Sequence, residues 1–134
     1  MRRSESREAA FLLLFSVESG NSDLNEAKES AEESFGLETD LGAVNLARHV
    51  LEKKDELDTI IGKYSTSRTT ARIPKVNLII ARIAVYEMTY SETPKKVAVN
   101  EAIELAKKYA DEQDRQFVSG ILGSYYNDIT KSSE

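Results

Sequence analysis

The chain has 134 residues, of which 40% are hydrophobic, so it can bury one core of usual size and is expected to form a single domain over residues 1–134. Its formal net charge is -5, so the chain lacks the strong overall positive field of a protein that binds nucleic acid without a partner. Any binding of nucleic acid must therefore use a local basic patch. The absence of cysteine excludes disulfides, thiolate zinc sites and a cysteine nucleophile, and it fits a reducing, cytoplasmic environment.

The distribution of helix breakers predicts an all-α fold. Proline occurs only at positions 74 and 94, and no alternating run of β-branched residues suggests a sheet. The first helix is expected from about Ser4 to Glu18 and should end at Gly20, where a left-handed conformation costs little. We interpret its apolar run, Ala9 to Phe15, as structural, because no small-residue cleavage site of a signal peptide follows it. No apolar run approaches the roughly 20 residues that span a bilayer, so no membrane segment is expected.

The next two helical regions differ in how strongly they are anchored. Residues 21–40 hold seven acids against a single lysine, which predicts a solvated, weakly anchored helix followed by a turn at Gly36. A longer helical region, from about Thr39 to Tyr64, supplies many apolar core contacts. We expect it to bend near Lys54 and Asp55, where the apolar pattern lapses.

The helix expected from Val76 to Tyr90 is unusual because its apolar side chains point all round the cylinder. Such a helix belongs at the centre of a bundle, surrounded by the other helices. Glu87 lies within it, and a buried carboxylate must find a hydrogen-bond donor. We therefore interpret Glu87 as a structural anchor rather than a catalytic group.

Two amphipathic helices are expected toward the C-terminus. The first covers Lys96–Lys108, where apolar residues recur on one face. The second begins at Asp111, whose carboxylate can cap the free amides of the first turn. Gly120 lies inside this helix, where glycine costs about 1 kcal/mol relative to alanine, and we expect the close approach of a neighbouring helix to compensate. After Asp128 the chain is expected to fray.

Basic residues gather in one segment although the chain is acidic overall. Residues 63–82 carry five basic residues and no acid. Within this segment the loop that follows Tyr64 is rich in hydroxyls and contains Arg68 and Arg72. Such loops can bind phosphate oxygens while an aromatic ring stacks on a base. A solvated loop with incidental arginines is the alternative, and it applies equally to the small basic group at the N-terminus.

The remaining candidates for chemistry are weak. Glu101 and Glu104 lie about one helical turn apart, but no histidine or third carboxylate completes a metal site. His49 is the only histidine, and we interpret it as a surface residue. The sequence has no Gly-rich phosphate loop and no nucleophile elbow. We therefore expect no metal, no cofactor and no enzymatic activity.

Four parts of the sequence together form a recognisable pattern. They are Arg3–Ala9 followed by Leu14 and Phe15, then Ile80–Met88, Pro94–Lys107 and Phe117–Leu122. In order and spacing these parts resemble the NusB family of transcription antitermination factors. The likeness covers nearly the whole chain, residues 20–60 excepted, and its most specific block lies within Pro94–Lys107.

The resemblance implies an all-α fold, a compact bundle of about seven helices in two small helical subdomains. It also implies a role without catalysis. Proteins of this family pair with NusE, which is also a small-subunit ribosomal protein, and together they hold the single-stranded boxA element of nascent RNA. The pair thereby supports antitermination by the transcription elongation complex and ribosomal RNA synthesis. A basic partner would supply the phosphate attraction that this acidic chain lacks. Whether the chain forms a homo-oligomer is left open.

Carried over to this sequence, the resemblance implies RNA contacts at the N-terminal arginines, in the loop after Tyr64 and at Phe117. Phe117 also belongs to the apolar stripe of the last helix, so its ring could serve packing, stacking or both. Asn77 and Ser119 depart from the family, which usually has an acid and an asparagine at these positions. The residues expected at the RNA interface are Arg2, Arg3, Arg7, Tyr64, Arg68, Arg72, Lys75 and Phe117.

One alternative stays open. The chain could be a NusB-like helical adaptor, related to the N-terminal domain of ribosomal RNA cytosine methyltransferases, that binds protein rather than RNA. The diluted basic start supports this alternative, because Ser4, Glu5 and Ser6 separate its arginines. Methyltransferase activity itself cannot reside in this chain, which has no cysteine.

Overall fold

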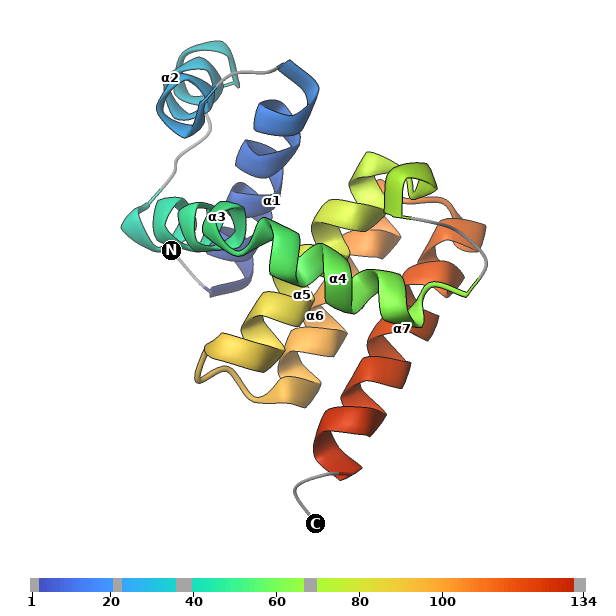
Figure 1. Cartoon of the computed structure of the whole chain (residues 1–134). Coiled ribbons are helices and arrows are strands. Elements are labelled where there is room, and N and C mark those ends of the chain that lie inside the picture. The colour runs from blue at the N-terminus through green and yellow to red at the C-terminus, as the bar shows by residue number, and fades with distance from the viewer. Residues whose placement is uncertain (1–2, 21–22, 36–39, 67–69, 132–134) are drawn as a thin grey trace. The chain divides into compact units, whose positions relative to one another are not determined.

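A computed structural model describes residues 3–20, 23–35, 40–66 and 70–131. Within these residues the chain forms seven α-helices, one short 3-10 helix and no strand, which confirms the predicted all-α class (Figure 1). The elements are α1 Arg3–Gly20, α2 Leu24–Phe35, α3 Leu41–Glu52, α4 Lys54–Tyr64, η1 Thr70–Arg72, α5 Lys75–Tyr90, α6 Lys95–Tyr109 and α7 Glu112–Lys131. The predicted turn at Gly36 lies outside the described residues.

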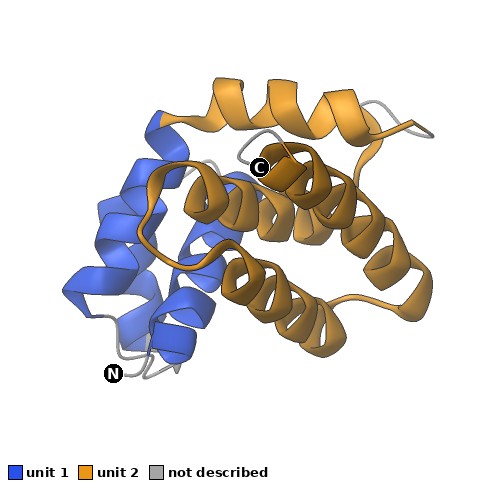
Figure 2. Cartoon of the chain, turned by 90° about the horizontal axis from the view of Figure 1, so that it is seen from below, with its two compact units in different colours: residues 1–52 blue, residues 53–134 orange. Residues whose placement is uncertain are grey.

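The chain divides into two compact units, residues 1–52 and residues 53–134 (Figure 2). The division falls at Lys53, which precedes α4 with a backbone φ of -101° and ψ of 10°. The helical region expected from Thr39 to Tyr64 is therefore two helices, and the structure confirms the predicted interruption one residue before Lys54. Two units also agree with the two helical subdomains that the family resemblance implied.

Unit 1 is built on the packing of α1 against α3, with α2 beside them. Asp40 links α1 to α3. Its carboxylate accepts hydrogen bonds from the Ala43 amide of α3 at 2.7 Å and from the Ser6 hydroxyl of α1 at 2.8 Å. These two bonds lower the pKa of Asp40, the Ala43 amide having the larger effect. Helix α2 buries only Ala27 among its described side chains. The prediction of a solvated, weakly anchored helix is confirmed.

Unit 2 is organised around α5, as predicted. Ten of its residues between Asn77 and Met88 are buried, and α4, α6 and α7 all pack against it. Arg82 is one of the buried residues, and its guanidinium forms two hydrogen bonds to the Asp58 carboxylate on α4, at 2.7 and 2.9 Å. Glu87 is also buried, as its position in this helix predicted.

Helix α7 begins as the sequence predicted and ends later. The Asp111 carboxylate accepts a hydrogen bond from the Asp114 amide at 2.8 Å, which caps the first turn. The prediction that the chain frays after Asp128 is wrong for residues 129–131, because α7 continues to Lys131, while residues 132–134 lie outside the described residues. Two side-chain hydrogen bonds support this last part. The Thr130 hydroxyl donates a hydrogen bond to the carbonyl of Tyr126 at 2.7 Å. The Asp128 carboxylate accepts a hydrogen bond from the hydroxyl of Tyr64 at the end of α4.

Candidate nucleic-acid interface

Unit 2 contains a small pocket between the end of α4 and one face of α7, with a volume of about 270 Å³. Tyr64 and Thr66 line it on the α4 side. On α7 the lining residues recur every three or four positions, which places them on one helix face. They include Gln116, Phe117, Gly120 and Ser124. The pocket thus combines two aromatic rings with hydroxyl and amide groups.

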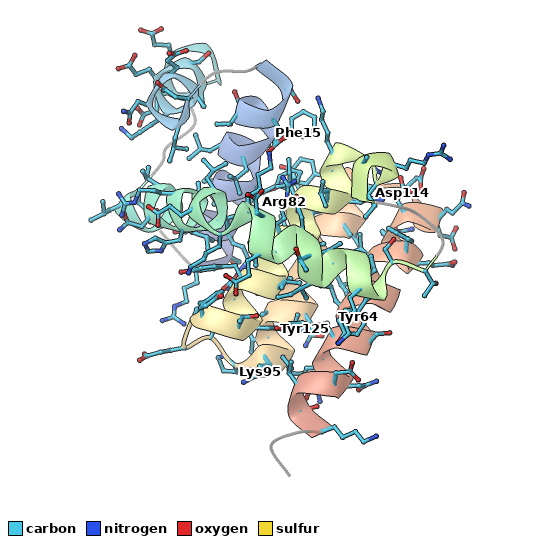
Figure 3. All side chains as sticks on the ribbon, in the orientation of Figure 1. Phe15, Tyr64, Arg82, Lys95, Asp114 and Tyr125 are labelled. Carbon is cyan, nitrogen blue, oxygen red and sulfur yellow. The ribbon has the colours of Figure 1, made fainter. Side chains whose placement is uncertain are left out.

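Tyr64 is held in place by α7. Its hydroxyl donates a hydrogen bond to the Asp128 carboxylate at 2.5 Å, and its ring meets the Tyr125 ring edge-on at a centroid distance of 5.7 Å (Figure 3). Tyr125 is fixed in turn by a 2.7 Å hydrogen bond between its hydroxyl and that of Thr89 on α5. The hydrogen bond to Asp128, followed by partial burial, raises the pKa of Tyr64 to about 12. The phenol therefore keeps its proton, and its hydrogen bond to Asp128, to a higher pH than a free tyrosine would.

Phe117 stands at the edge of the apolar stripe of α7. Val118, Ile121 and Leu122 are buried, whereas Phe117 is half-buried and lines the pocket. The ring therefore has a covered part and a part that faces the pocket. Phe117 therefore takes part in packing, and its role in stacking on RNA stays a prediction.

Gly120 corrects one expectation. A Cβ atom built at Gly120 meets nothing within 4 Å, so no neighbouring helix approaches closely enough to require glycine there. Gly120 is exposed and lines the pocket instead. The missing side chain keeps the pocket open on this side.

The structure places two predicted basic residues on the surface of unit 2, between α4 and α5. Arg72 ends η1 and Lys75 begins α5, and both are exposed. Ile73 between them is buried and anchors this segment to the core. Lys63, which the prediction did not include, lies over the ring of Tyr64 at 5.5 Å from its centroid. Arg68 lies outside the described residues.

The N-terminal arginines are divided in unit 1. Arg3 is exposed at the start of α1, whereas Arg7 is buried with 5% of its surface exposed. A phosphate could reach the Arg7 guanidinium only after a change in the position of that side chain. Arg2 lies outside the described residues. Within unit 2 the structure therefore brings Tyr64 and Phe117 together in one pocket, and within unit 1 Arg3 is an exposed residue.

Sequence reasoning missed Gln116 and Ser124. Both lie on the α7 face that carries Gly120, at spacings of four residues. A stripe of small and polar residues beside Phe117 was the available signal. The apolar positions of the same helix give a stronger periodic signal than this stripe.

The described residues contain neither a cluster of metal-ligating side chains nor a membrane-spanning helix. These residues include no group of three or more histidine, cysteine, aspartate or glutamate side chains placed to hold a metal ion. None of the helices in the described part of the chain is long and apolar enough to cross a membrane.

The fold and the pocket define an all-helical binding protein with an aromatic, hydroxyl-lined site. The chain belongs to the NusB family, whose sequence model matches residues 4–127. The transcription antitermination protein NusB of Bacillus subtilis (strain 168) is 39% identical over 133 residues, which cover 98% of this chain and 100% of that protein. The chain is therefore a transcription antitermination factor of the NusB type.

Solved structures support the same assignment. A chain in the crystal structure of antitermination factors NusB and NusE in complex with dsRNA has a TM-score of 0.81 and 25% identity, and the match covers 94% of this chain and 96% of that one. NusB from T. maritima has a TM-score of 0.78 and 30% identity, with 92% of this chain and 89% of that chain covered.

Proposed function

We propose that this chain binds boxA-type single-stranded RNA together with NusE, and that it thereby supports ribosomal RNA transcription as a non-enzymatic component of the elongation complex in the cytoplasm. The observation that carries the proposal is the pocket between α4 and α7, where Tyr64 and Phe117 lie beside polar groups. The solved relative that contains NusE and dsRNA supports both the partner and the class of ligand.

The pocket favours an unpaired base over a duplex. Single-stranded RNA is recognised by splaying out a base, stacking it on an aromatic ring and bonding its edge. Phe117 offers part of a ring, while Gln116 and Ser124 offer hydrogen-bonding groups within the same pocket. Each base stacked in this way contributes about 1–3 kcal/mol.

The charges favour a partner-dependent complex. Arg72 and Lys75 provide exposed cations in unit 2, and Arg3 provides one in unit 1. Arg2 and Arg68 belong to the same proposal. The whole chain nevertheless has a net charge of -5, which repels the phosphates of RNA. Phosphate neutralisation dominates RNA affinity, so a basic partner such as NusE is needed for tight binding.

A gel-shift titration tests the proposal. We expect a boxA-type RNA to bind the chain with NusE present much more tightly than without it, and Phe117→Leu to weaken the ternary complex roughly 10- to 100-fold through loss of stacking. Tyr126→Leu, on the same helix but outside the pocket, is the matched control and should leave binding unchanged. Equal binding with and without NusE, or none in its presence, would refute the proposal.

A second candidate is the protein-binding adaptor. The burial of Arg7 favours it, because burial removes one cation from an N-terminal group that is already diluted. Replacing Arg3, Arg68 and Arg72 with alanine, and leaving the buried Arg7 in place, separates the two candidates. RNA binding with NusE should fall and become less salt-dependent if the chain binds RNA, whereas an adaptor should show the same RNA signal as before.

A further inference from the structure

A second depression lies on the other side of α7. It has a volume of about 530 Å³ and is formed by α6 and α7. Lys107 contributes from α6, and Glu112, Arg115, Gln116, Ser119 and Gly120 contribute from α7. Its charged lining differs from the aromatic pocket between α4 and α7, which we call the Tyr64 pocket.

The two depressions meet at two residues. Gln116 and Gly120 line both of them, and these residues lie one helical turn apart on α7. The shortest path from one depression to the other therefore crosses α7 at Gly120. Apart from the adjoining backbone of α7 itself, a Cβ atom there would meet no atom within 4 Å, so the space above Gly120 is open.

Glycine inside a helix lowers its stability relative to alanine, and the fold supplies no packing reason for it at this position. Glycine in a regular element also marks places where a ligand approaches the backbone closely. The surroundings indicate which ligand. On one side are aromatic rings, and on the other are the Arg115 guanidinium and the Lys107 ammonium, the latter 3.1 Å from Glu104.

This arrangement of a ring, a bare backbone and a cation matches the repeating unit of a single-stranded nucleic acid, in which each base is followed by a phosphate. Arg115 is half-buried, and no ion pair of its side chain occurs among the described residues. Within the described part of the chain, Glu112 is the one acidic residue that lines the depression. Lys107 already forms an ion pair with Glu104. Arg115 is therefore the stronger candidate for binding a phosphate.

We propose that the RNA strand crosses α7 at Gly120, with a base in the Tyr64 pocket and the adjoining phosphate in the α6–α7 depression beside Arg115 and Lys107. This inference rests on the proposed function. It adds a path for the strand and assigns Gly120 as the residue that lets the strand approach the helix.

A pair of glycine substitutions tests the crossing. Gly120→Leu places a side chain on the path, whereas Gly123→Leu places one on the same helix, three residues on, where a Cβ atom also meets nothing within 4 Å and where neither depression is lined. With NusE and a boxA-type RNA we expect at least a tenfold loss of affinity for Gly120→Leu and less than a twofold change for Gly123→Leu. Thermal unfolding checks that both variants are folded, and Gly120→Ala, which can only favour the helix, should show a smaller loss in the same direction.

A second pair tests the phosphate. Arg115→Gln should reduce the slope of log affinity against log salt by about 0.7, the value for one contact to a single strand. Lys108→Gln, next to Lys107 but outside the lining, should leave the slope unchanged.

The results separate failure of the inference from failure of the proposed function. If the unsubstituted chain with NusE does not bind the RNA, the proposed function fails and this inference fails with it. If it binds and the Gly120 and Gly123 variants bind equally well, only the crossing is overturned. If Gly120→Leu weakens the binding of NusE in the absence of RNA, the depression belongs to the protein partner and the RNA path is wrong.

Discussion

The two units of the molecule bury different kinds of side chain. In the described part of unit 1, five of the nine buried apolar residues are alanines, and α2 contributes only Ala27. In unit 2 the core contains many large aliphatic residues, among them Ile79, Ile80 and Ile83 of α5. Burial of a large side chain contributes about 1.5–3 kcal/mol, far more than burial of a methyl group. The pocket proposed to bind RNA therefore lies in the unit whose core contributes more burial free energy to folding.

The largest expected change in stability comes from shortening a buried side chain at the centre of unit 2. Ile83→Ala should reduce the free energy of unfolding by about 2–5 kcal/mol, because the removed atoms leave a cavity in α5. Leu41→Ala in unit 1, where the side chain is 75% exposed, should change it by less than about 0.5 kcal/mol. Urea denaturation measures both variants. Similar losses for the two would contradict the central position of Ile83 in the core of unit 2.

The next effect has the opposite sign. Asn77 is buried in α5, and neither polar atom of its side chain has a hydrogen-bond partner among the described residues. Replacing a buried unpaired amide with an apolar group of similar shape removes a desolvation cost of about 1–3 kcal/mol. Asn77→Leu should therefore raise the unfolding midpoint, and the exposed Asn100→Leu should not. A destabilised Asn77→Leu would mean that the amide has a partner after all.

A matched pair of alanines sharpens the contrast. Ala27 in α2 and Ala84 in α5 are both 1% exposed, and glycine at either position should cost about 1 kcal/mol in helix propensity. For Ala27→Gly we expect the cost to appear as faster amide exchange confined to α2, since weakly anchored helices open locally. For Ala84→Gly it should appear in the global unfolding of unit 2. Hydrogen exchange that is equally slow in α2 and α5 would remove the distinction.

The smallest effect concerns the cap of α3. The pKa of Asp40 is lowered in the folded chain, so its contribution to stability is present above the unfolded pKa of about 3.9 and is lost as the pH falls through the lower folded value. Asp40→Asn should therefore lower the melting temperature at pH 7, and the difference from the parent should shrink below pH 4. Glu92→Gln, at an exposed position between α5 and α6, controls for the loss of one charge. A difference independent of pH would show that the carboxylate charge is unimportant.

Much of the fold could be predicted from periodicity. The all-round apolar pattern of Val76–Tyr90 identified the central helix, and the lapse of the pattern near Lys54 located the division between the units. The cap at Asp111 was predicted from its residue type. These predictions succeeded because each depends on a few neighbouring residues and on nothing distant.

The candidate site was harder to predict, because it depends on residues far apart in the sequence. Tyr64 and Phe117 were expected at the RNA interface, but their common pocket follows from the packing of α4 against α7. Arg7 was expected on the surface although it lies one turn before Ala10, on the buried stripe of α1, where the helical spacing already favours burial. Position on the buried stripe therefore decides the placement of Arg7 despite its charge.

The hydrogen bond between Tyr64 and Asp128 joins two residues that are 64 positions apart. Asp128 lies outside the pocket lining, so a chain shortened just before it would retain every wall of the pocket and lose the group that orients the phenol. Changes near the C-terminal end of α7 can therefore release the Tyr64 ring and alter the shape of the pocket without replacing any residue that lines it.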